Sequence, residues 1–396
     1  MSRPRLLVIA STFPGRPDDG TPAFVRDLAL AESEDFDTTV IVPMVSGAPR
    51  HERIGDLEIL RFRYFFRRWE DLADGAMLEN LRNRRSRLAQ VLPFMAAEWL
   101  AVRRAVREIR PDLMHVHWII PQGIVVAGMM RRTPCVVTTL GGDLYGLRNA
   151  PARALKRRVV KRAAAITTMN QDMRLQIIAL GGAPEATRVM PMGADLTGIR
   201  AAAGDFDRIA GRLLFVGRLV EKKGLAYLLD ALRAMDTSRF TLTVVGDGPL
   251  RTELEGKAAG LPVTFVGQLG RAELAAEYAR SEVVVIPSAK AASGDQDGLP
   301  VVLLEAMGLG CAVVASDLPG INEVVLDGKT GRLVPPADSS ALTAALTELL
   351  ADSDARRTLG EGARELSDSL SIPAVGARYR ALLAEVRAGA SASGPM

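Results

Sequence analysis

A turn meets an apolar helical segment in Gly294-Asp295-Gln296-Asp297-Gly298-Leu299-Pro300-Val301-Val302-Leu303-Leu304-Glu305-Ala306. Pro300 suits the first turn of a helix, because its missing N–H would have no intrahelical partner there. Asp297 then lies near the N-cap, and Glu305 follows about two turns further along. Such a helix start offers free N–H groups and a positive dipole end to a phosphate, while the acids can accept hydrogen bonds from hydroxyls. The stretch predicts a nucleotide-sugar site, although a helix cap followed by a half-buried Glu305 would give the same pattern.

A second segment places two cations on a strand-to-helix loop. The apolar run 213–216 reads as a buried strand, and it continues into Gly217-Arg218-Leu219-Val220-Glu221-Lys222-Lys223-Gly224. Parallel α/β sheets bind their ligands at loops of this kind. Arg218 supplies a planar fork and Lys223 a compact point charge, so the pair suits the two phosphates of a nucleoside diphosphate. Each segment alone is a weak signal, and the two in this order are a specific one.

The ordered pair resembles glycosyltransferase family 4, the retaining, nucleotide-sugar-dependent transferases with the GT-B fold. The segments Val244–Pro249 and Ala312–Ser316 are similar to the C-terminal domain of that family as well. The resemblance covers nearly the whole chain and is densest from Arg212 to Val334. It implies an α/β protein of two Rossmann-like, doubly wound parallel-sheet domains that face one another across a cleft.

The resemblance also implies roles for particular residues. Arg218 and Lys223 would stabilise the departing diphosphate, and Asp297, where relatives commonly have Glu, would hold sugar hydroxyls. Glu305 would bind the ribose hydroxyls, and the base would rest near residues 266–268. Transfer would retain the anomeric configuration by front-face displacement, with no cofactor and no metal. The further donor-binding residues that we expect are Gly217, Gly267, Gln268, Gly298, Leu299 and Pro300.

Three candidates for the acceptor or sugar side lie in the N-terminal half. Gly20 belongs to the loop after the first strand, where relatives have a Gly-Gly pair. His115 and His117 alternate along a strand and so face the same side, with His117 expected nearer the cleft; packed core histidines are the alternative. Leu140 stands where relatives often carry a His, so no role is transferred to it. Asp143, three residues further on, is a candidate for a hydroxyl contact.

The composition is that of a globular chain with two domains. Its 396 residues are too many for one typical core, and 48% are hydrophobic and 24% charged. Cys135 and Cys311 both lie in apolar runs, which indicates buried thiols rather than a disulfide framework. The run that begins at Arg5 reads as the first strand, so we expect no signal peptide ahead of it, and no apolar run reaches the roughly 20 residues that span a bilayer. We therefore expect a cytoplasmic protein.

Both halves alternate β-rich runs with helical segments, which is the pattern of parallel doubly wound sheets. We expect an N-terminal acceptor domain at 1–198 and a C-terminal donor domain at 199–371, with 198–210 as the linker. A terminal helix at 372–388 would return to the N-terminal domain, and 389–396 would be disordered. The expected strands are 5–10, 38–43, 57–62, 112–116, 134–139, 164–168, 212–216, 241–245, 263–266, 282–286 and 312–315.

Positive charge is concentrated in the N-terminal half. Arginines flank aromatic residues in Arg61–Trp69, and more arginines follow in Arg82–Arg87. Segments of this kind can rest on anionic lipid headgroups, which would make the protein peripheral on the inner face of the cytoplasmic membrane, or they can be ordinary solvated faces. Nucleic acid is the least favoured partner, because no sequence motif of a nucleic-acid-binding domain accompanies the positive charge.

The sequence thus predicts transfer of a sugar from a UDP-, GDP- or TDP-sugar to a hydroxyl of an acceptor sugar, a lipid-linked sugar or a small molecule. Two alternatives stay open. A sugar-nucleotide epimerase or a phosphorylase could share the phosphate-binding residues on the same fold. The second alternative is a non-catalytic subunit that binds a sugar nucleotide. Leu140 favours this alternative, whereas the presence of Arg218, Lys223 and Glu305 argues against it.

Overall fold

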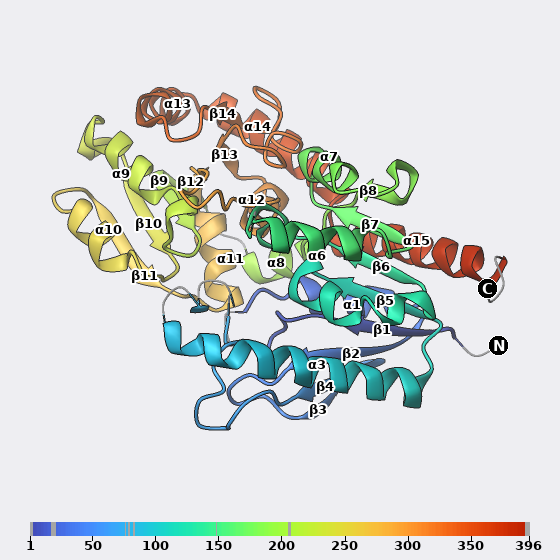
Figure 1. Cartoon of the computed structure of the whole chain (residues 1–396). Coiled ribbons are helices and arrows are strands. Elements are labelled where there is room, and N and C mark those ends of the chain that lie inside the picture. Colours follow the sequence, from blue (N-terminus) through green and yellow to red (C-terminus); the bar gives the residue numbers. More distant parts are fainter. Residues whose placement is uncertain are drawn as a thin grey trace. The chain divides into compact units, whose positions relative to one another are not determined.

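The computed structural model describes residues 3–16, 21–75, 77, 80–81, 84–147, 149–204 and 207–392, which form two compact units (Figure 1). The N-terminal unit comprises Met1–Met192 together with Val375–Met396, and the C-terminal unit is Gly193–Ala374. Each unit is built on one largely parallel sheet with helices in its crossovers. These two Rossmann-like units confirm the predicted α/β class. None of the described helices is long and apolar enough to cross a bilayer.

The sheet of the N-terminal unit has eight strands in the order β3-β4-β2-β1-β5-β6-β7-β8. All neighbours are parallel except β3, which runs antiparallel to β4 at the edge. The short edge strands β3 and β8 were not expected, because neither has a long apolar run. The strands are β1 (Arg5–Ile9), β2 (Asp37–Pro43), β3 (His51–Ile54), β4 (Leu57–Phe62), β5 (Leu113–His117), β6 (Cys135–Thr138), β7 (Ala165–Thr168) and β8 (Thr187–Val189).

Side-chain caps start two helices of this unit. The amide oxygens of Asn149 and Asn170 accept hydrogen bonds from backbone N–H groups at the starts of α6 and α7. The helices are α1 (Phe24–Glu32), α3 (Leu88–Ile109), α4 (Ile124–Val126), α5 (Gly142–Tyr145), α6 (Ala150–Val160), α7 (Gln171–Ala179) and α15 (Ile372–Ala392), with shorter turns at Arg85–Arg87, Ile119–Gly123, Met129–Arg131 and Pro184–Ala186.

The C-terminal unit has a six-stranded, wholly parallel sheet in the order β11-β10-β9-β12-β13-β14. The strands are β9 (Ile209–Val216), β10 (Thr241–Val245), β11 (Val263–Gly267), β12 (Ser281–Ile286), β13 (Ala312–Ser316) and β14 (Arg332–Val334). The helices are α8 (Leu196–Ala203), α9 (Leu225–Arg233), α10 (Arg251–Lys257), α11 (Arg271–Arg280), α12 (Val301–Gly308), α13 (Ser339–Ala351) and α14 (Ser353–Asp368), with turns at Glu221–Lys223 and Thr237–Arg239.

Helices cover both faces of this second sheet. Leu213 and Phe215 of β9 belong to one apolar cluster, while Leu214 and Val216 belong to another. Because successive side chains of a strand point to opposite faces, the continuous apolar run of β9 fills both clusters. This is why the run carries no polar alternation.

The segment 198–210 is not the expected linker. Its first part lies in α8, and strand β9 begins at Ile209. The side chain of Asp195 caps α8 by accepting from the Gly198 N–H at 2.8 Å, and Leu196 and Ile199 are buried in the core of the C-terminal unit. The small, polar composition concealed this amphipathic helix.

The terminal helix α15 packs on the N-terminal unit. One face buries Val375, Tyr379, Leu382 and Leu383, at the spacing of a helical stripe. The Tyr379 hydroxyl donates to the Met190 carbonyl at 2.8 Å. The helix continues to Ala392, past the expected start of a tail at 389, while residues 393–396 lie outside the described part.

We predict that Leu383→Ala destabilises the N-terminal unit by about 2–5 kcal/mol, because a fully buried leucine leaves a cavity when it is truncated. Arg387→Ala, on the exposed side of the same helix, should change stability by less than about 0.5 kcal/mol. Urea unfolding followed by circular dichroism compares the two variants. Equal midpoints would contradict the docking of α15.

Candidate active site

Three loops meet at the carboxyl edge of the second sheet. Gly224 ends the loop after β9 with φ +69°, and a Cβ there would overlap the carbonyl oxygen of Pro287, which follows β12. Gly246, after β10, has φ +125°, and a Cβ there would overlap the carbonyl of Gly217. Glycine is needed at both positions, since it alone accepts the positive φ and the close backbone approach. The contacts hold the β9 loop against its neighbours.

The two predicted segments meet in a cluster of lysines and aspartates. Lys223 Nζ lies 2.7 Å from Asp297 Oδ2. Lys222 Nζ lies 3.4 Å from both Asp297 Oδ1 and Asp295 Oδ2. All four side chains are 13–20% exposed, so their charges are only partly screened by water. The structure therefore brings the cations of one loop and the acids of the other to one place.

The charges of this cluster fix its protonation state. Burial alone would raise the pKa of Asp297, but the ammonium groups of Lys223 and Lys222 outweigh it and hold that pKa below its ordinary value. Burial alone would lower the pKa of Lys222, yet Asp297 and Asp295 outweigh it and raise that pKa. Near pH 7 the acid is therefore a carboxylate and the lysine an ammonium ion.

Hydrogen bonds from backbone N–H groups tie the acidic loop to the basic one. The Ala289 N–H donates to the Lys222 carbonyl at 2.9 Å, and the Ala292 N–H donates to Glu221 Oε1 at 2.8 Å. Within the acidic loop, the Ala291 N–H donates to the Asp295 carbonyl at 2.9 Å. These contacts position the carboxylates before any ligand is bound.

Helix α12 starts one residue later than expected. Pro300 is the N-cap and Val301 the first helical residue, so Asp297 lies before the cap instead of at it. No side chain of the described residues caps this helix, and Asp295 and Asp297 pair with lysines instead. Glu305 lies within α12, where its Oε2 accepts from the buried Tyr278 hydroxyl at 3.1 Å.

The other expected donor-binding residues lie around this cluster within the C-terminal unit. Arg218 is half-buried in the β9 loop, beside Gly217, whose N–H donates to the Val245 carbonyl at 3.0 Å. Gly267 ends β11 with φ +75°, and its carbonyl accepts from the Gly246 N–H at 2.7 Å, while Gln268 is exposed. Gly298 and Pro300 are buried, and Leu299 is half-buried.

Asp143 is occupied by the chain itself. Its carboxylate, at the start of α5, accepts from the Ile119 N–H at 2.7 Å and from the Thr139 hydroxyl at 2.9 Å. The N–H groups of Leu140 and Gly141 donate to it as well, at 3.1 and 3.2 Å. Burial raises its pKa above the ordinary value. This arrangement ties two loops together and leaves little capacity for a hydroxyl of a ligand.

His115 and His117 both lie inside the N-terminal unit, fully buried. His115 bonds to Glu32 through Nδ1 and to Thr138 through Nε2, each at 2.7 Å. His117 lies beside it with ring centroids 4.3 Å apart and the rings tilted by 40°, and neither of its ring nitrogens has a hydrogen-bond partner among the described residues. Burial, and to a lesser extent His115, keeps the pKa of His117 well below its ordinary value, so its imidazole is neutral.

One expected site residue lies outside the described part of the chain, and one lysine of the cluster was not predicted from the sequence. Gly20 lies outside the described residues. Lys222 was not singled out from the sequence, although its neighbour Lys223 was; the adjacent pair Lys222-Lys223 was the available signal. Among the residues that the structure describes, no group of three or more His, Cys, Asp or Glu side chains could hold a metal ion.

Two protein-family models match the chain. The one described as "Glycosyl transferase 4-like domain" matches residues 19–193, and the one described as "Glycosyl transferases group 1" matches residues 210–352. The first match covers most of the N-terminal unit and the second most of the C-terminal unit.

Curated relatives agree with these models. The amylovoran biosynthesis glycosyltransferase AmsK of Erwinia amylovora is 33% identical over 180 residues, which are 44% of each chain. The putative colanic acid biosynthesis glycosyltransferase WcaL of Salmonella typhimurium is 34% identical over 43% of each chain. This chain thus spans less than half the length of these two relatives. A longer match, 32% identical over 63% of this chain and 69% of the relative, is a GDP-mannose-dependent alpha-(1-6)-phosphatidylinositol monomannoside mannosyltransferase of Mycolicibacterium smegmatis.

Solved structures show the same fold. Sucrose-phosphate synthase of Thermosynechococcus elongatus superposes with a TM-score of 0.78 at 21% identity, over 98% of this chain and 100% of that one. Anabaena Alr3699/HepE, solved with UDP-glucose, gives a TM-score of 0.67 at 19% identity, over 96% and 99% of the two chains. The likeness confirms the predicted GT-B architecture. With both family models in order along the sequence, the chain belongs to glycosyltransferase family 4, the group 1 glycosyltransferases.

Proposed function

We propose that this chain is a retaining glycosyltransferase that moves a sugar from a nucleotide-diphosphate sugar to an acceptor hydroxyl in polysaccharide, glycolipid or glycoconjugate biosynthesis. The observation that carries the proposal is the contact of Lys222 and Lys223 with Asp297 at the carboxyl edge of the second sheet. It gathers cations for a diphosphate and a carboxylate for sugar hydroxyls within one small volume. The names of the relatives support the reaction and the biosynthetic setting.

The diphosphate of the donor would replace Asp297 as the partner of Lys223. Arg218 and the N-terminus of α12 would add further positive charge around the departing phosphate. The freed oxygen of Asp297 would then accept from hydroxyls of the transferred sugar, and Glu305, steadied by Tyr278, would accept from the ribose. The leaving diphosphate would take the acceptor proton on the same face, which gives retention.

Donor and acceptor remain open within this proposal. Solved neighbours contain UDP or UDP-glucose, whereas the mycobacterial relative is GDP-mannose-dependent, so UDP-, GDP- and TDP-sugars are all donors to test. An epimerase or phosphorylase reaction and a non-catalytic subunit are not favoured, because the named relatives are glycosyltransferases. A sugar-nucleotide screen read for transfer, epimer and sugar phosphate separates the three.

Lys223→Ala and Arg218→Ala should each lower transfer at least a hundredfold while the protein stays folded. Each removes a charge-assisted contact of about 1.5–3 kcal/mol to the diphosphate, with a further loss as charge develops in the transition state. Lys257→Ala is the matched control, because that lysine pairs with Asp230 on the surface of the same unit. Wild-type turnover of either site variant, measured by release of nucleoside diphosphate, would rule out this phosphate site.

We further propose that transfer needs no metal ion. Two lysines and an arginine can neutralise the diphosphate, and both acids of the Asp295-x-Asp297 pair are engaged by lysines. Turnover should therefore survive excess EDTA, measured in the same assay. Complete loss of turnover that Mg²⁺ restores would contradict this.

The finer proposal for partners is attachment to anionic membranes through α3. Arg61 takes no part in it, because its side chain is fully buried and pairs with Glu52 at 2.7 Å. Leu88, Leu92 and Trp99 are instead 58%, 77% and 39% exposed along one side of α3. Exposed apolar side chains flanked by arginines suit the interface of an anionic bilayer, here the inner face of the cytoplasmic membrane.

The triple variant Leu88→Ser, Leu92→Ser and Arg85→Ser should lose co-sedimentation with phosphatidylglycerol vesicles. Each cation near such a surface contributes about 1 kcal/mol, and each buried leucine contributes about 1.5–3 kcal/mol. Affinity for UDP should be unchanged, which controls for folding of the donor unit. A native protein that ignores these vesicles at low salt would contradict the membrane proposal.

A further inference from the structure

The N-terminal unit contains a cavity of about 880 Å³ that no part of the donor site uses. Its lining residues come from three segments: 44–48 after β2, 63–74 after β4, and 84–90 at the entry to α3. The strands β2 and β4 are parallel neighbours, so the cavity lies at the carboxyl edge of the sheet. This is the edge at which open α/β sheets bind ligands. The volume is that of a site for a ligand of several chemical groups.

The acidic side chains of the cavity are already engaged by the chain. Glu70 pairs with Arg63 at 3.0 Å and accepts from the backbone N–H groups of Tyr64 and Phe65 at 2.7 and 3.3 Å. Asp74 accepts from the Ser46 N–H at 3.2 Å. These carboxylates hold loops in place and do not leave the cavity acidic.

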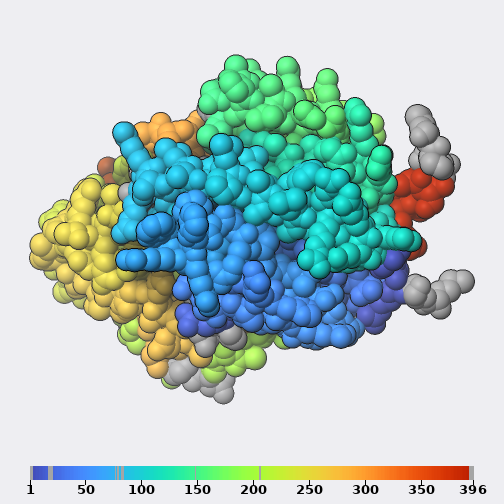
Figure 2. All heavy atoms as spheres, turned by 60° about the horizontal axis from the view of Figure 1, so that its bottom comes forward, coloured from blue at the N-terminus to red at the C-terminus, as the bar shows by residue number. Residues whose placement is uncertain are grey.

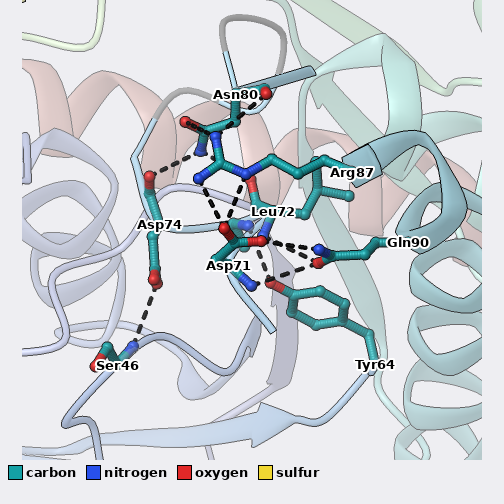
Figure 3. A network of polar contacts seen from close by, with 9 residues as sticks. Ser46, Tyr64, Asp71, Leu72, Asp74, Asn80, Arg87 and Gln90 are labelled. Carbon is teal, nitrogen blue, oxygen red and sulfur yellow. Dashed lines mark hydrogen bonds and ion pairs between the residues drawn. The ribbon is translucent and has the colours of Figure 1, made fainter. Parts of the chain in front are cut away.

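Asp71 lies at the centre of the network in Figure 3, where Arg87 donates to it at 2.7 Å and Gln90 at 2.8 Å. The hydrogen bond from Arg87 is the main cause of the lowered pKa of Asp71. Gln90 also accepts from the Leu72 N–H at 3.2 Å, and Asn80 donates to the Leu72 carbonyl at 3.0 Å. The floor of the cavity is thus fixed before a ligand arrives, which lowers the entropy lost on binding.

Three arginines of the cavity remain available. The side chains of Arg67, Arg68 and Arg84 are exposed, and they make no hydrogen bond or ion pair with any residue in the described ranges. The cations that do pair, Arg63 and Arg87, are neutralised by Glu70 and Asp71. The net charge of the cavity is therefore positive. It is carried by guanidinium groups, whose planar geometry suits phosphate oxygens.

Exposed apolar side chains border the same cavity. Trp69 lines it and is 58% exposed, with its ring centroid 6.2 Å from that of Phe66, which is 69% exposed. Leu88, the first residue of α3, is 58% exposed and directly follows the lining residue Arg87 in the sequence. Figure 2 shows this face of the N-terminal unit, with α3 running across it beside the segment that follows β4. A cationic centre that binds an anion and an apolar border are the two halves of a site for an amphiphile.

We propose that this cavity binds the diphosphate of a lipid-linked acceptor, an inference that rests on the proposed glycosyl transfer. Arg67, Arg68 and Arg84 hold the diphosphate oxygens. The lipid tail leaves over Trp69 and Phe66, and the saccharide occupies the rest of the cavity. A free phosphorylated sugar offers the same anion without the tail, and the test separates the two.

Farnesyl diphosphate is the probe, titrated by calorimetry below its aggregation limit and with UDP present in excess to occupy the donor site. The native protein should bind it, and Arg67→Gln/Arg68→Gln/Arg84→Gln should weaken binding at least tenfold. The control Arg107→Gln/Arg131→Gln/Arg132→Gln removes the same charge from exposed arginines outside the cavity and should bind as the native protein does. Inorganic diphosphate should bind at least tenfold more weakly than farnesyl diphosphate.

Equal affinity of the two triple variants for farnesyl diphosphate would contradict the proposed site. Inorganic diphosphate that binds as tightly as farnesyl diphosphate would contradict the proposal that the ligand carries a lipid tail. UDP binding, measured separately, keeps the two proposals apart. A native protein that binds UDP and not farnesyl diphosphate contradicts only this inference. A native protein that binds no sugar nucleotide contradicts the proposed function itself.

Discussion

The ion pairs between Lys222, Lys223, Asp295 and Asp297 are the interaction on which the candidate donor site depends. Buried or half-buried charges are costly unless they are paired, so the two loops that carry them are held together in the absence of a donor. The same pairing holds the two lysines at the place where a diphosphate would bind. Exchange of one anion for another at Lys223 costs far less than gathering isolated cations, which is electrostatic preorganisation. The close approach of Gly224 to the backbone of Pro287 makes the geometry possible.

The N-terminal unit has a comparable site, but the cations of this site outnumber its carboxylates. Its cavity also lies at the carboxyl edge of a parallel sheet, and two of its carboxylates, Glu70 and Asp71, are paired with arginines. Here, however, Arg67, Arg68 and Arg84 have no ion-pair partner among the described residues, whereas Lys222 and Lys223 of the C-terminal unit are both paired. We connect this difference to the ligands: one site must release its cations to a small donor, and the other must hold an anion at a surface bordered by Trp69. We therefore propose one phosphate-binding edge in each unit.

Much of the fold could be predicted from the sequence. Apolar runs such as that of β9 locate the buried strands, while α8 was taken for a linker, because its polar and small residues conceal the buried face of Leu196 and Ile199. Lys223 lies on the loop between β9 and α9, as the apolar run before it predicts, yet its partner could not be predicted from the sequence. Pairing of Asp297 with Lys223 joins residues far apart in sequence, and no local pattern encodes it. The cavity could be predicted only as two arginine-rich segments, Arg61–Trp69 and Arg82–Arg87, because which arginines are buried, as Arg61 is, depends on the loops packed around them.

The most direct test of the central claim is a crystal structure of this protein with UDP bound. The account predicts that Lys223 Nζ leaves Asp297 and lies about 3 Å from an oxygen of the diphosphate, with Asp297 turned toward the place of the sugar. It also predicts that Glu305 contacts the ribose while keeping the Tyr278 hydroxyl as its donor. A complex in which Lys223 still pairs with Asp297, and the diphosphate binds away from the β9 loop, would contradict it.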